Sequence, residues 1–178
     1  MSWWDKVLRQ GAPEGFSGKL DAQENVLATA EVTGGGHVLA TSHGLWLPDE
    51  DGARRIGWHL ISKATWGNGS LVVIEAVEDG HAGAAVLLSD LPARRYKLAK
   101  PGKVPQVVQE RVTGSIKTRH RQEFPGGGAW FVQRKVAGRD GFVLQVRPDP
   151  GTDRDSVAAV AEKVAAAVEQ AREKRAAN

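Results

Sequence analysis

Alternation of polar and apolar residues, interrupted at short intervals by glycine, is the feature that most constrains the fold of this chain. Between residues 26 and 147 apolar side chains recur at every second position, as they do in a β-strand with one buried face. The clearest interruption is Asn68-Gly69, because a type I′ hairpin turn needs positive φ at both central residues. The pattern predicts a mostly antiparallel sheet built from consecutive hairpins.

The predicted strands form two groups, separated by a short helix over residues 103–113. The first group lies within residues 24–100 and includes a strand on which Ile56, Trp58 and Leu60 share one face. Its strands are expected at residues 26–32, 38–41, 45–47, 56–60, 64–66, 71–77 and 82–88. The second group is a three-strand meander over residues 115–148, with strands at residues 115–124, 129–136 and 141–147.

Helical spacing marks both ends of the chain. Residues 152–175 begin with a capping box from Thr152 to Asp155 and continue as an amphipathic helix with a stripe of valine and alanine. Residues 1–20 are expected to form a short helix and a loop, with Trp3 and Trp4 covering apolar surface of the sheet; a membrane interface is the alternative for this helix. No segment rich in proline or serine divides the chain, so we expect one domain over residues 1–178, with Gly102 as the only plausible boundary.

Several function classes have no support in the sequence. Cysteine is absent, which excludes disulfides, thiolate metal ligands and cysteine nucleophiles. His37 and His43 are close in sequence but lack the companions of a zinc site, and Ser42-His43 lacks the glycines of a nucleophile elbow. We therefore expect no catalytic residues, no metal and no cofactor. The first residues carry no apolar run and no stretch has the length of a membrane span, so a cytoplasmic protein is expected.

Charge is distributed unevenly along the chain. Residues 1–93 hold six Lys and Arg against twelve Asp and Glu, whereas residues 94–135 hold eleven basic residues against two acidic ones. Within the basic segment, Lys117, Arg119 and Arg121 fall on one face of a predicted strand, and either Lys135 or Arg134 joins them, depending on the register. This face is either a binding surface for phosphate or carboxylate groups, or a solvated strand that discourages pairing with other chains.

The remaining tryptophans suggest two different roles. Trp58 and Trp130 alternate with apolar neighbours, which favours a place in the core. Trp46 and Trp66 are left as candidates for an exposed aromatic surface.

A resemblance to bacterial pleckstrin-homology-like domains covers residues 24–100. It rests on three segments: Val38-Leu39-Ala40-Thr41-Ser42-His43-Gly44-Leu45-Trp46-Leu47, Arg54-Arg55-Ile56-Gly57-Trp58-His59-Leu60-Ile61, and Thr65-Trp66 followed by Leu71-Val72-Val73. The whole chain also resembles a group of high-GC bacterial proteins without a described function. The resemblance implies a bent antiparallel barrel closed at one end by a C-terminal amphipathic helix. Three further strands before the last helix depart from that pattern.

These observations together predict an α+β protein, mostly β, with a short N-terminal helix and a long C-terminal helix. We expect a non-enzymatic binding or scaffold module that recognises a protein partner, including a second copy of itself. The alternative is an anion-binding module for nucleic acid or acidic membrane, with Lys117, Arg119, Arg121 and Lys135 as contacts. A third interpretation, an enzyme or small-ligand carrier, would need a deep polar pocket holding His43 or His59 with a carboxylate.

Overall fold

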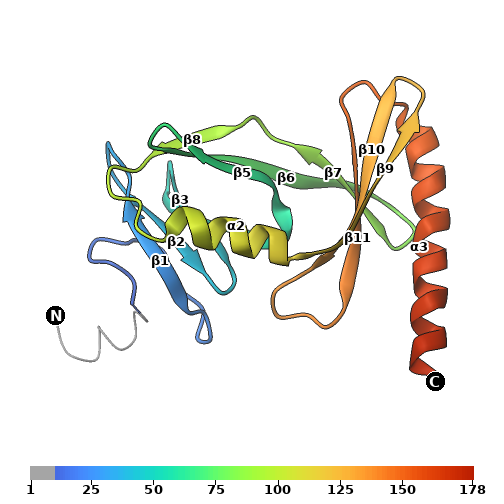
Figure 1. Ribbon diagram of the computed structural model, residues 1–178, viewed down its shortest axis with the longest axis horizontal. Coiled ribbons are helices and arrows are strands. Elements are labelled where there is room, and N and C mark those ends of the chain that lie inside the picture. Colours follow the sequence, from blue (N-terminus) through green and yellow to red (C-terminus); the bar gives the residue numbers. More distant parts are fainter. Residues whose placement is uncertain (1–10) are drawn as a thin grey trace. The chain divides into compact units, whose positions relative to one another are not determined.

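The computed structural model describes residues 11–178, which form a mostly-β α+β structure with two α-helices (Figure 1). The predicted N-terminal helix with Trp3 and Trp4 lies outside the described residues. The chain divides into two compact units. Unit 1 combines the chain up to Glu75 with Pro92–Ser115 and Ala137–Arg139, and unit 2 combines Ala76–Leu91, Ile116–Val136 and Asp140–Asn178.

Unit 1 is built from two sets of antiparallel strands. Strands β1 (Val26–Glu31), β2 (His37–Thr41), β3 (Gly44–Asp49) and β4 (Gly52–Gly57) form a meander in chain order. Strand β5 (Ile61–Gly67) pairs with the first half of β6 (Ser70–Ala82), which also pairs with β8 (Arg94–Lys97). Asn68 and Gly69 join β5 to β6 with φ values of 50° and 73°, so the hairpin turn predicted from the sequence is confirmed.

Both sets of strands in unit 1 curl around one core, which helix α2 (Val104–Gly114) completes. The core contains Leu45 from β3, Leu71 from β6, and Val104 and Val108 from α2. Helix α2 contacts β1, β2 and β5, which explains why its valines recur at helical spacing.

The strand predicted through Trp58 and Leu60 is wrong beyond Gly57. A single 3-10 turn, η1 (Trp58–Leu60), follows β4 instead. Trp58 still reaches the core, as expected, and its indole Nε1 donates a hydrogen bond of 2.9 Å to the carbonyl oxygen of Thr41. Burial of the Trp58 ring with its indole N–H hydrogen-bonded therefore stabilises this segment more than a continued β-strand with alternating side chains would.

Unit 2 is a sheet with one helix packed on it. Its strand order is β6, β7 (Ala85–Asp90), β11 (Phe142–Pro148), β10 (Gly127–Lys135) and β9 (Ile116–Phe124), and only the β7–β11 pair is parallel. The predicted three-strand meander is confirmed as β9, β10 and β11. Helix α3 (Arg154–Ala176) contacts β7 and β11, and in Figure 1 it runs in red beside the orange strands of this unit.

The valine and alanine stripe of α3 packs on the sheet as its composition predicts. Val157, Ala161 and Ala165 are buried in a core that includes Phe131 of β10 and Val146 of β11. Ala171, which the stripe also includes, is exposed. The predicted capping box is wrong, because Asp153 occupies the N-cap position and the Thr152 hydroxyl instead donates a hydrogen bond of 3.1 Å to the carbonyl oxygen of Gly128.

The resemblance implied that the last helix closes the strands of residues 24–100, and the structure corrects this expectation in part, because within that segment α3 contacts β7 while another helix contacts β1, β2 and β5. The helix that contacts β1, β2 and β5 is α2, whereas α3 contacts strands of unit 2. Gly102, the boundary considered from the sequence, lies inside unit 1. The two units have separate hydrophobic cores, but strand β6 contributes to both units. The expectation that residues 1–178 behave as one domain therefore stays a prediction. Among residues 11–178, neither α-helix has the combined length and apolar character needed to cross a membrane.

Candidate functional site

The register of unit 2 aligns three long side chains across one face of its sheet. Trp130 of β10 lies opposite Arg121 of β9 and opposite Arg147 of β11, and directly opposed residues share a face. Arg119 lies opposite Val132, one row further along the same face. We call Arg119, Arg121, Trp130 and Arg147 the arginine-tryptophan face. It is the face opposite to the one on which Ala129 and Phe131 join the core with α3.

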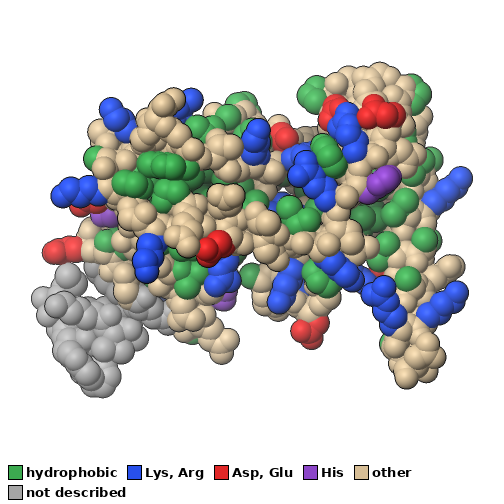
Figure 2. Space-filling model, viewed as in Figure 1, with side chains coloured by type: hydrophobic (Ala, Val, Ile, Leu, Met, Phe, Trp, Pro, Cys, Tyr) green, Lys and Arg blue, Asp and Glu red, His purple; other side chains and the backbone are tan. Residues whose placement is uncertain are grey.

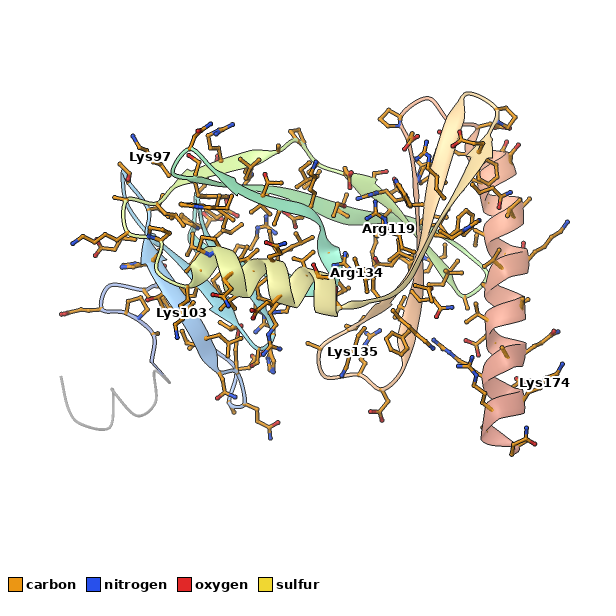
Figure 3. All side chains as sticks on the ribbon, viewed as in Figure 1. Lys97, Lys103, Arg119, Arg134, Lys135 and Lys174 are labelled. Atoms are coloured by element: carbon orange, nitrogen blue, oxygen red, sulfur yellow. The ribbon has the colours of Figure 1, made fainter. Side chains whose placement is uncertain are left out.

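Trp130 is a platform for two arginines of the neighbouring strand. The Cζ atom of Arg119 lies 4.0 Å from the centroid of the Trp130 ring, and that of Arg121 lies 5.5 Å away (Figure 3 labels Arg119). Arg119 is exposed, and within the described chain no carboxylate lies at ion-pair distance from it. A stacked guanidinium keeps its N–H donors in the plane of the group, where they can bind an incoming carboxylate in bidentate fashion.

Arg121, by contrast, has two carboxylate partners. Its guanidinium donates to Asp149 with N···O distances of 2.5 and 3.3 Å, and to Glu123 at 3.0 Å. The hydrogen bond from Arg121 lowers the pKa of Asp149 and raises that of Arg121. In Figure 2 basic and acidic side chains adjoin one another over the upper ends of these strands. Asp149 and Glu123 therefore balance the charge of Arg121 and hold its guanidinium in place, so Arg121 does not offer a free cation to a ligand.

Gly128 makes the Arg121–Asp149 contact geometrically feasible. A Cβ atom at this position would lie 2.6 Å from Nη2 of Arg121 and 3.0 Å from the carbonyl oxygen of Gln122. The guanidinium thus occupies the space that a side chain on β10 would fill.

Replacing Gly128 by alanine is expected to displace the Arg121 guanidinium from Asp149 and to lower the free energy of unfolding by about 1 kcal/mol, because the clashing atom is the movable end of a partly exposed arginine. Chemical denaturation measures the change. Gly67→Ala in β5 is the matched control, because no atom lies within 4 Å of a Cβ there and its effect should stay below about 0.5 kcal/mol. Equal effects in both variants would contradict the steric role assigned to Gly128.

A cavity of about 350 Å³ lies beside Trp130, which is close to the lower limit of ordinary ligand pockets. Its walls include Ser89 and Asp90 at the end of β7, Arg147 of β11, Asp149 in the following loop and Arg154 at the start of α3. Arg147 lies 3.5 Å from Asp90, and Arg154 forms an ion pair of 2.7 Å with Asp79. The cavity thus combines an indole wall with paired charges, a combination suited to a side chain that carries both apolar and polar atoms.

Lys117 departs from the predicted one-sided basic stripe. The β9–β10 register shifts between Gln133 and Arg134, and this irregularity removes Lys117 from strict alternation with Arg119. Its ammonium lies 4.7 Å from the ring centroid of Phe142. Since Phe142 alternates in phase with Leu144 and Val146, which face α3, Lys117 contacts a residue of the opposite face.

The register also decides between Arg134 and Lys135, which the sequence left open. Arg134 alternates in phase with Trp130, so it is the residue that lies on the arginine-tryptophan side, whereas Lys135 is exposed and out of phase. The choice of Lys135 as a contact of that face is therefore wrong. Burial, together with nearby Arg147, lowers the pKa of Arg134 to about 10.

The structure changes the position expected for two of the tryptophans, Trp46 and Trp130. Trp46 is only 8% exposed and packs edge-to-face against Phe16 at a centroid distance of 5.4 Å, so it is not part of an exposed aromatic surface. Trp66 is 39% exposed and stays a candidate. The core role predicted for Trp130 is wrong, because it lies on the face opposite to Phe131. The alternating sequence pattern shows that Trp130 and Phe131 lie on different faces of the sheet. It does not show which of the two faces a helix covers.

A second cluster of titratable groups, in unit 1, places two carboxylates beside His43, for which the sequence had shown no companions of a metal site. Asp21, Glu24 and His43 place their ligand atoms within 4.8 Å of one another, a spacing that could suit a metal ion. However, Nη1 of Arg55 donates to Asp21 at 2.9 Å and to Glu24 at 2.6 Å, so a guanidinium already supplies the positive charge. His43 lies 3.4 Å from Asp21 at the exposed side of this network. We assign the cluster a structural role.

Glu24 is the buried centre of that cluster. One carboxylate oxygen accepts hydrogen bonds from the Thr41 hydroxyl at 2.6 Å and from Nε1 of Trp46 at 2.8 Å, and the other accepts from Asp21 N and Arg55. Burial acts to raise the pKa of Glu24, but these hydrogen bonds and the charge of Arg55 outweigh it and hold the pKa below its ordinary value. Glu24 is therefore ionised in the folded protein at neutral pH.

Comparison of the chain with models of known protein families, with curated proteins and with solved structures gave no match.

Proposed function

We propose that this protein is a non-enzymatic binding module and that the arginine-tryptophan face of unit 2 docks a protein segment that carries carboxylates. The observation that carries this proposal is the stacking of Arg119 on Trp130, in a part of the described chain where Arg121 and Arg147 have acidic partners and Arg119 has none within ion-pair distance. An ordered, exposed guanidinium offers a preorganised binding site, because little side-chain entropy is lost when a carboxylate binds to it.

A protein partner fits this face better than a polyanion does. Tryptophan and arginine are the residues most enriched at the energetic centres of protein interfaces, and the cavity beside Trp130 could accommodate a side chain of the partner. The arginines of this region are interspersed with Asp79, Asp90 and Asp149, whereas surfaces for nucleic acid or acidic membranes carry a continuous excess of positive charge. The anion-binding alternative is therefore the less supported function.

We further propose that unit 1 is a pleckstrin-homology-like domain in which α2 is the closing helix. Two observations support this proposal: the β1–β4 meander and the β5, β6 and β8 strands surround one core, and α2 follows β8 directly and packs on β1, β2 and β5. Unit 2 would then be an addition to that domain, inserted through the long β6–β7 hairpin and continued after α2.

Co-purification with tagged full-length protein tests the proposed function. We expect at least one partner whose recovery with the Arg119→Ala and Trp130→Ala variants falls to about a tenth or less of the wild-type amount, because these residues form the centre of the interface. Arg95→Ala and Trp66→Ala are matched controls, since both residues are exposed and lie in unit 1. Circular dichroism should show that all four variants keep the wild-type fold.

The same variants separate the two candidate functions. If binding is recovered with nucleic acid or anionic vesicles and falls steeply with added salt, the module is an anion-binding one and the protein-docking proposal is incorrect. If the control variants lose the partner as strongly as the Arg119 and Trp130 variants, the docking surface lies elsewhere.

A further inference from the structure

Strand β9 is an edge of the sheet in unit 2. It pairs only with β10, at the end of the strand order β7, β11, β10, β9. No backbone hydrogen bond outside the sheet ladder involves residues 116–124 in the described part of the chain. Alternate residues of such an edge direct their N–H and C=O groups away from the sheet, where they can pair with another extended chain.

This edge is open on both sides of the sheet. Lys117, Thr118, Arg119 and His120 are consecutive and all exposed, although alternate residues of a strand point to opposite faces. Helix α3 packs mainly on β7 and β11, and on β9 it is Phe124, the last residue of the strand, that packs against the core shared with α3. An added strand could therefore lie beside β9 without first displacing α3.

Charge indicates which kind of strand this edge would accept. Antiparallel pairing of two copies of β9 centred on Arg119 would place the guanidinium of Arg119 opposite that of its own copy. Like charges directly opposed across a ladder are destabilising. An acidic segment reverses the sign of this contact, because a carboxylate of the added strand would lie beside Arg119, the arginine of this face that has no acidic partner within ion-pair distance in the described chain.

We propose that an acidic, extended segment of a partner protein adds to unit 2 as a further strand along the free edge of β9. The segment carries acidic residues at every second position, directed to the arginine-tryptophan face, while its backbone pairs with the outward N–H and C=O groups of β9. This inference rests on the proposed function and specifies how the same face is engaged: main-chain hydrogen bonds supply the alignment, and Arg119 on Trp130 supplies the recognition of charge.

The test uses full-length protein and a synthetic nine-residue peptide, acetylated and amidated, in which glutamate alternates with threonine and valine. Two further peptides have the same side chains but carry N-methyl groups, either on every glutamate or on every intervening residue. Since only alternate residues of an added strand donate to β9, one methylated peptide should bind at least about tenfold more weakly, and the other should stay within about twofold of the parent.

The possible results separate the two proposals. If the parent peptide binds through Arg119 but both methylated peptides bind as tightly as the parent, or both lose affinity equally, strand addition is overturned while the docking face stands. If the parent peptide does not bind above a control peptide in which lysine replaces glutamate, both proposals fail. Amide hydrogen exchange gives an independent readout, because amides of residues 116–124 that are exposed in the free protein should become protected in the complex.

Discussion

Replacement of Glu24 by alanine should lower the free energy of unfolding by about 2–4 kcal/mol, because hydrogen-bond donors buried around its carboxylate lose their acceptor. The variant leaves the Trp46 indole N–H and the Asp21 N–H without this acceptor and deprives Arg55 of its buried carboxylate. The Thr41 hydroxyl keeps the carbonyl oxygen of Gly44, and Arg55 keeps Asp21. These groups join the segment before β1 to β2, β3 and β4, so their loss weakens most of the first meander. Chemical denaturation of the full chain measures the effect.

Glu14→Ala is the matched control for this variant. Glu14 is an exposed glutamate in the same segment before β1, and its removal should change the free energy of unfolding by less than about 0.5 kcal/mol. Because the pKa of Glu24 is lowered in the folded state, its contribution is complete above the pKa of the unfolded chain and is lost as the pH falls through the lower folded value. The difference between wild type and Glu24→Ala should therefore narrow below about pH 4. A difference independent of pH would contradict this account of the cluster.

Replacement of Ala161 by glutamate should destabilise the protein by more than about 3 kcal/mol. Ala161 is fully buried between α3 and the sheet, in the core that contains Phe131, Leu144 and Val146. A glutamate there overfills a closely packed contact and buries a carboxylate without a partner. Ala166→Glu is the control, because Ala166 lies on the exposed side of the same helix and tolerates a charged side chain.

This variant also tests the single-domain prediction. Strand β6 pairs with β5 and β8 in unit 1 and with β7 in unit 2, so we expect loss of the second core to destabilise both units together. Hydrogen exchange would then accelerate to a similar extent at the slowest amides of β2 and of β10. Faster exchange confined to β10 would show that the two units unfold independently.

The parts of the fold that sequence predicts well depend on local interactions. The Asn68-Gly69 turn, the β9–β11 meander and both described helices follow from backbone preferences and from periods of two or 3.6 residues. Strand β8 was missed because three of its four residues are basic and only Tyr96 is buried, which gives too few residues to show alternation. Its assignment requires the partner strand β6.

The binding face was only partly predictable, for a related reason. The sequence identified Arg119 and Arg121 as neighbours on one side of a strand, and the structure places both beside Trp130. It could not identify Arg147 or exclude Lys117, because these assignments depend on the register of β10 against its two neighbours and on one irregularity in that register. Which helix covers which strands is likewise a long-range property, so β1, β2 and β5 are contacted by α2 and not by the C-terminal helix that the resemblance implied.

The most direct test of the proposed docking face follows the indole N–H signals of the tryptophans by NMR while the alternating glutamate peptide is added to the full-length protein. The account predicts that the signal of Trp130, identified by its absence from the Trp130→Ala variant, shifts in a saturable way, and that the signal of exposed Trp66 does not. A saturable shift at Trp66 with none at Trp130 would contradict the assignment of the binding face to unit 2.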